Sequence, residues 1–129
     1  MDIKRSFSLT EYEEGVWVEI DGEECFRLRA ASAPEFQEAL QEFFASQEKP
    51  NPWDARKFAI AQAGIAEWKN LTIGGEAVGP YSPELAEKLL EDWPKLARRI
   101  EREINVLTAR SEEARLDAEG NSEGSSAGG

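Results

Sequence analysis

The chain has 129 residues, a net charge of −11 and a hydrophobic content of 40%, which suits one modest globular domain. It contains no histidine and one cysteine, Cys25, which excludes histidine-based triads, histidine metal sites, multi-cysteine zinc sites and internal disulfides. The negative charge repels nucleic-acid phosphates and anionic membranes. No apolar run approaches the roughly 18 residues of a membrane span, and we expect a cytoplasmic protein that binds neither nucleic acid nor membrane.

The residue pattern of the N-terminal segment, up to residue 29, predicts β structure. Phe7 and Leu9 alternate with polar residues, which suggests a strand. Residues 16–20 and 25–29 then flank Asp21-Gly22, a strong hairpin signal. We therefore expect an N-terminal antiparallel hairpin or small sheet.

The register of this hairpin follows from its apolar residues. A two-residue loop mixes polar and apolar side chains on one face, whereas a three-residue loop, Asp21 to Glu23, separates them. The second arrangement pairs Val16 with Leu28 and Val18 with Phe26. It also sets Trp17 against Arg27 on the other face, as a cation–π pair. The hairpin is structural in this interpretation, and an exposed Trp17 used for binding is the alternative.

A first helix is predicted from Ser32 to the loop at residues 47–50. Ser32 and Glu35 have the spacing of a capping box. An apolar stripe follows at helical spacing: Phe36, Ala39, Leu40, Phe43 and Phe44. The stripe indicates a core-facing side, and a groove for a partner is the alternative.

The second helix is predicted over residues 52–68, with Asn51 as its cap and Pro52 at its first position. It is apolar on most sides and is therefore expected to be the central, buried helix. The alternative is that another subunit covers one of its apolar sides, which would be self-association.

A short corner joins this helix to the next. Residues 71–73 and 77–78 are β-prone and flank the turn pair Gly74-Gly75, which predicts a second small hairpin. Ser82 is then a good N-cap and Pro83 suits a first helical position, so a helix is expected over residues 83–91. These elements predict an α+β fold.

The last helix is predicted from Pro94 to about Arg110, because proline is accepted only in a first helical turn. Its apolar stripe comprises Trp93, Leu96, Ala97, Ile100, Ile104 and Leu107. Its basic residues are Lys95, Arg98, Arg99, Arg102 and Arg110. They either neutralise the acidic body or form a surface for an acidic partner or for self-association. Residues 1–110 thus form one domain, and the acidic, Gly/Ser-rich residues 111–129 are expected to be disordered.

The corner also carries a family resemblance. A Trp, a short apolar strand, a Gly-containing turn and a Pro-aromatic-Ser-x-Glu helix start resemble the small tail assembly chaperones of long-tailed bacteriophages. The matching residues are Trp68, Leu71, Ile73, Gly75, Pro80, Tyr81, Ser82 and Glu84. The turn, Gly74-Gly75, lacks the Asp of the family pattern.

The resemblance implies a function in tail assembly. Such proteins bind the tape measure protein, keep it soluble and help to recruit tail-tube subunits, in the host cytoplasm and not in the mature virion. Our candidate partner-binding residues are Trp68, Tyr81 and Trp93. Alternatives are an acidic decoy that mimics nucleic acid and binds a host protein, and a minor structural head–tail component.

No chemistry of an enzyme is expected. The close carboxylates lie in polar contexts, where no apolar or charged niche would shift their pKa values. The glycines form no phosphate loop, the acids have no calcium-loop spacing, and Cys25 lies between Glu24 and Phe26, a setting that does not activate a thiol. We therefore expect no catalytic residues, no cofactor and no metal.

Overall fold

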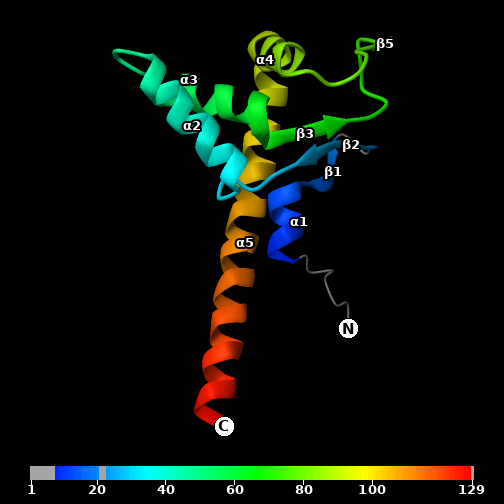
Figure 1. Cartoon of the computed structure of the whole chain (residues 1–129). Helices are drawn as coiled ribbons and strands as arrows, with labels where there is room; N and C mark the ends of the chain where they lie inside the picture. Colours follow the sequence, from blue (N-terminus) through cyan, green and yellow to red (C-terminus); the bar gives the residue numbers. More distant parts are fainter. Residues whose placement is uncertain (1–7, 21–22, 129) are drawn as a thin grey trace.

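The computed structural model describes residues 8–20 and 23–128, with side chains for residues 8–20 and 26–117. It has the expected α+β architecture: a three-stranded antiparallel sheet in the order β1-β2-β3, a separate two-stranded hairpin, and helices (Figure 1). The long helix α5 (Pro94–Gly128) runs along the molecule, with α1 beside it and α4 at one end. The helices α2 and α3 form an antiparallel pair on the side of the fold away from β5.

The first described element is a helix, α1 (Leu9–Glu14), so the strand expected around Leu9 is wrong. A complete capping box overrides the short alternation: Glu11 N donates to Ser8 Oγ at 3.2 Å, and Ser8 N donates to the Glu11 carboxylate at 3.3 Å. Phe7 lies outside the described residues. The helix buries Tyr12 and ends at Gly15, whose φ of 119° favours glycine.

The hairpin of β1 (Val16–Ile20) and β2 (Glu23–Leu28) has the expected register. Val16 pairs with Leu28, Trp17 with Arg27 and Val18 with Phe26. The strands nevertheless close over two residues, 21–22, which lie outside the described residues, and not over three. A β-bulge after Val18 absorbs the difference, because Glu19 then pairs with Glu24 and Cys25 is the extra residue.

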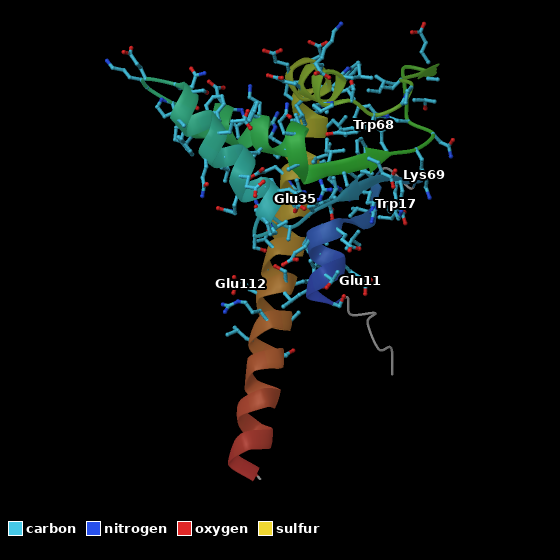
Figure 2. The ribbon with its side chains drawn as sticks, viewed as in Figure 1. Glu11, Trp17, Glu35, Trp68, Lys69 and Glu112 are labelled. Carbon is cyan, nitrogen blue, oxygen red and sulfur yellow. The ribbon has the colours of Figure 1, made fainter. Side chains whose placement is uncertain are left out.

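Trp17 and Arg27 pair across the strands as expected, but the expected cation–π contact between them is wrong, because the cation beside the Trp17 ring is Lys69. Lys69 Nζ lies 4.3 Å from the Trp17 ring centroid, and Figure 2 shows the two side chains together at the sheet. Arg27 instead donates from Nε to Gly15 O at 3.2 Å and from Nη1 to Glu67 at 3.4 Å. The reason is tertiary, since β3 brings Glu67 next to Arg27.

Helix α2 (Pro34–Ser46) begins where expected, but its capping box is absent. The N-cap is Ala33, which makes no side-chain cap, because Ser32 contacts α5 instead. The hydroxyls of Ser32 and Ser111 lie 3.0 Å apart, and Ala31 N donates to Thr108 Oγ1 at 2.9 Å. These contacts attach the start of α2 to α5. The buried residues of α2 are Phe36 and Ala39.

The predicted helix over residues 52–68 is three elements: α3 (Pro52–Ala59), the π-helical turn η1 (Ile60–Gly64) and β3 (Ile65–Trp68). The cap is confirmed, since Asn51 Oδ1 accepts from the backbone N–H groups of the first turn. The prediction that residues 65–68 are helical is wrong. These residues form β3, which pairs with the otherwise open edge of β2. Gly64 allows the close approach at this switch: a Cβ there would lie 3.0 Å from Ile104 Cδ1 and 3.1 Å from Phe36 Cε2.

The second hairpin and the following helix are confirmed. Strands β4 (Thr72–Ile73) and β5 (Glu76–Ala77) flank Gly74 and Gly75, whose φ angles of 61° and 83° suit a type I′ turn. Helix α4 (Pro83–Asp92) is capped by Ser82, whose Oγ accepts from Leu85 N at 3.2 Å.

Helix α5 begins at Pro94 as expected, but its expected end near Arg110 is wrong. The next turn still packs on the body, because Ser111 is buried and donates its hydroxyl to Thr108 O at 2.8 Å. The helix continues to Gly128. Disorder of residues 111–129 stays a prediction.

The core lies where α2, α3, the sheet and α5 meet. Its largest fully buried side chains are Phe26, Phe36, Leu28, Ile60, Ile65, Ile100 and Ile104. Among the described residues, no helix has the length and apolar content to cross a bilayer.

Candidate partner-binding surface

The structure brings two of the three predicted site residues together. Trp68 ends β3, and Tyr81 lies just before α4; their ring centroids are 5.1 Å apart at an angle of 88°, an edge-to-face contact. Trp68 also meets Phe26 edge-to-face, at 6.2 Å. Its Nε1 donates to Gly79 O at 2.7 Å, and only 6% of the residue is exposed. We call Trp68 and Tyr81 the aromatic latch, because their contact holds the corner of residues 69–82 against the sheet.

Tyr81 connects the latch to η1. Its hydroxyl donates to Ala61 O at 2.6 Å. Burial raises the pKa of the Tyr81 hydroxyl above its usual value of 10.0; nearby Arg29 acts to lower this pKa and Glu84 acts to raise it. The phenol is therefore neutral and can donate this bond over the physiological pH range.

Trp93 lies away from the latch, at the junction of α4 and α5. It is the C-cap of α4, and 48% of the residue is exposed. This exposure differs from the core-facing position that its place in the apolar stripe predicted. Helix α4 ends at Asp92 and α5 begins at Pro94, so Trp93 is the single residue between the two helices.

An open groove of about 610 Å³ lies beside Trp93. Its apolar lining comes from Trp93, Leu96 and Ile20, the last residue of β1. Among the described residues, the charged side chains that line it are all basic and come from one side of α5: Lys95, Arg98, Arg99 and Arg102. Arg99 pairs with Glu103 at 3.2 Å, whereas Lys95, Arg98 and Arg102 form no ion pair within the described part of the chain.

A second hollow, of about 290 Å³, lies on the other side of Arg98. Trp53, which is 42% exposed, and Lys57 reach it from α3. It is completed by Leu90, Glu91, Pro94, Ala97 and Arg98. Since Arg98 lines both hollows, the exposed indoles of Trp53 and Trp93 flank one basic strip; we call the residues of both hollows the two-tryptophan surface.

This surface suits a partner that is apolar and acidic. The rings and aliphatic side chains offer apolar contact, and the guanidinium groups offer bidentate donors to carboxylates. The basic strip contrasts with the net charge of the whole chain, which is −11. Among the described residues, no group of His, Cys, Asp or Glu could hold a metal ion.

Sequence reasoning found part of this surface. The sequence singles out Trp93 and the basic residues of α5, but it predicts that Trp53 lies in a buried helix and Ile20 in a structural hairpin. The available signal for Trp53 was its place in the first turn, next to Pro52 and one turn before Lys57, where a helix end is often exposed. No local signal placed Ile20 beside α5.

A family profile described as YdaY prophage protein matches residues 29–121, which is most of the chain. The match begins just after β2 and includes the latch, both exposed tryptophans and the basic residues of α5. No curated protein and no solved structure matches this sequence.

Proposed function

The chain belongs to the YdaY prophage protein family and is thus phage-derived, and from this premise we propose that it is a tail assembly chaperone. In this proposal it binds the tape measure protein in the host cytoplasm, keeps it soluble and is left out of the finished virion. It helps to recruit the tail-tube protein and performs no enzymatic reaction. The resemblance of the corner from Trp68 to Glu84 to such chaperones supports the proposal.

The observation that carries the proposal is the two-tryptophan surface. Two indoles, each more than two-fifths exposed, flank a basic strip on an acidic protein, and Lys95, Arg98 and Arg102 of this strip form no ion pair with any described residue. An amphipathic helix with an acidic flank fits this arrangement, since its apolar side can cover the rings while its carboxylates meet Arg98 and Lys95. The remaining negative charge of the chaperone then keeps the complex dispersed.

The latch has a supporting part in this proposal. The rings of Trp68 and Tyr81 contact each other. Trp68 donates a hydrogen bond to Gly79 O, and Tyr81 donates one to Ala61 O. We therefore assign direct partner contact to Trp93 and Trp53, and the positioning of α4 to the latch.

Co-expression with the large tail protein encoded beside this gene tests the proposal. The wild-type chain should capture that protein and keep it in the soluble fraction. Trp93→Ala and Arg98→Glu should reduce capture at least severalfold, while Lys88→Glu, an equal charge change on the exposed side of α4, should not. No capture by the wild type, or equal capture by all variants, would refute the chaperone function or its site.

Mass spectrometry of purified virions separates the alternatives. Absence of the chain from finished particles supports a chaperone, whereas stable presence favours a minor structural component. Salt-sensitive binding to a basic host protein would favour an acidic decoy. The basic strip on α5 argues against the decoy, because it interrupts the continuous negative face that a nucleic-acid mimic needs.

A further inference from the structure

The solvent side of α5 carries a second regular pattern, distinct from its core-facing stripe. Its positions alternate at spacings of four and three residues, as in a heptad repeat: Lys95, Arg99, Arg102, Val106, Ala109, Glu113 and Leu116. All seven residues are exposed, including Val106 at 39% and Leu116 at 56%. Heptad spacing keeps these side chains on one face of the helix, where a second helix can lie lengthwise; only Val106, Ala109 and Leu116 are apolar, so pairing along this face depends on its charges. Within the described part of the chain, no element covers this stripe.

The charges along the stripe are segregated. Its first three positions are basic, its middle is apolar, and Glu113 and Leu116 form an acidic and apolar end. Arg102 and Glu113 form no ion pair within the described residues. A helix of this kind is complementary to itself only when the second copy runs in the opposite direction.

The position of α5 makes a covering partner favourable. Figure 1 shows that the C-terminal part of α5 extends beyond α1 with no other described helix or strand alongside it. Among the residues of α5 whose side chains are described, Ala114 is the last that packs partly on the core, while Arg115, Leu116 and Asp117 are exposed. A helix without tertiary packing is marginally stable in water, so this part of α5 gains most from a second helix.

We propose that two copies of this chain pair through α5 in an antiparallel arrangement, with the two-fold axis between Leu107 and Thr108. Arg102 then faces Glu113 of the second copy, and Val106 faces Ala109 of the second copy; symmetry makes each pair occur twice. The paired segment, residues 99–116, is about 27 Å long at the usual helical rise. A parallel pair would instead bring Arg102 against Arg102 and Glu113 against Glu113.

The groove beside Trp93 supplies the seat for the end of the partner helix. In this register, Leu116 of the second copy faces Arg99, next to the apolar side chains of Ile20 and Leu96. Asp117 of the second copy faces Arg98 in the same way. The groove thus offers an apolar floor to the exposed leucine and cations to the acidic residues around it.

The dimer is argued from other observations than the chaperone proposal, although both use the groove beside Trp93 and share Lys95, Arg98, Arg99 and Arg102. Glu113 and Leu116 belong to the dimer stripe and not to the two-tryptophan surface. Trp53 and Lys57 belong to the two-tryptophan surface and not to the stripe. Substitutions at these unshared positions therefore separate the two activities.

Sedimentation of the full chain over a range of concentrations tests the dimer. The wild type should dimerise. Arg102→Glu and Glu113→Arg should each raise the dimer Kd roughly tenfold or more, because two symmetry-related pairs change from attraction to repulsion. The double variant R102E/E113R should recover wild-type affinity, since both pairs are restored with their charges exchanged.

Mixing the two single variants gives a second readout. Each is weakened alone, but a heterodimer of R102E with E113R has two opposite-charge pairs and should form at wild-type affinity. Lys88→Glu and Glu38→Arg are the matched controls, with the same charge changes on exposed positions of α4 and α2. Circular dichroism confirms that every variant is folded. A monomeric wild type, single variants that dimerise normally, or a double variant that stays weak would overturn the proposal.

Discussion

Replacing Trp68 with alanine tests whether the aromatic latch holds the fold together. The residue is 6% exposed, meets the rings of Phe26 and Tyr81 edge-to-face, and donates to Gly79 O at 2.7 Å. Removing a buried tryptophan of this kind should lower the free energy of unfolding by about 3–5 kcal/mol. A domain of this size has about 5–15 kcal/mol in total, so the variant should be close to unfolding.

Urea denaturation followed by circular dichroism measures the change. Trp93→Ala is the matched control, because the same side chain is lost from a site that is 48% exposed; its cost should stay below about 1 kcal/mol. Trp68→Phe keeps a ring but leaves the Gly79 carbonyl without its donor, and it should lie between the two. A cost below about 1 kcal/mol for Trp68→Ala, or equal costs for the two alanine variants, would refute the distinction between latch and surface.

Three further predictions concern the core, alkaline pH and the α3–α5 contact. Gly64→Ala should destabilise by about 1–3 kcal/mol in the same urea assay, because the new Cβ would meet Phe36 at 3.1 Å; an unchanged midpoint would contradict this packing. Stability should fall as pH rises above 10, because burial raises the folded-state pKa of Tyr81 and the unfolded chain loses that proton first; in Tyr81→Phe this part of the pH dependence should disappear from thermal melts. Arg56→Ala should cost about 1–2 kcal/mol, since it removes a part-buried ion pair with Glu101 at 2.9 Å; double-mutant cycles with Glu101→Gln should show coupling, and additive effects would argue against the pair.

Local chemistry made several elements predictable. Asn51 and Ser82 accept backbone N–H groups within the next three residues, and Pro52, Pro83 and Pro94 stand at first helical positions. The Gly74-Gly75 turn likewise follows from two residues that accept positive φ. These features depend on neighbours in the chain, so they can be found without knowledge of the fold.

Other elements depended on contacts between distant residues. Residues 65–68 continue an apolar helical pattern, but the open edge of β2 turns them into β3. Ser32 has capping-box spacing, but its hydroxyl is hydrogen-bonded to that of Ser111, far along the chain. In both cases a tertiary partner competes successfully with a weak local preference.

The candidate site shows the same division. The sequence by itself determined the residue types: the acidic balance, the basic start of α5, the apolar register of the first hairpin and the aromatic residues Trp68, Tyr81 and Trp93. Only the tertiary structure decided which aromatics are buried, since Trp68 is covered by Phe26 and Tyr81, whereas Trp93 is left exposed where α4 ends and α5 begins. It also brought Trp53 and Ile20 to α5 from distant parts of the chain. The physical reason is that charge and propensity belong to a residue, whereas burial belongs to the packing of separate elements.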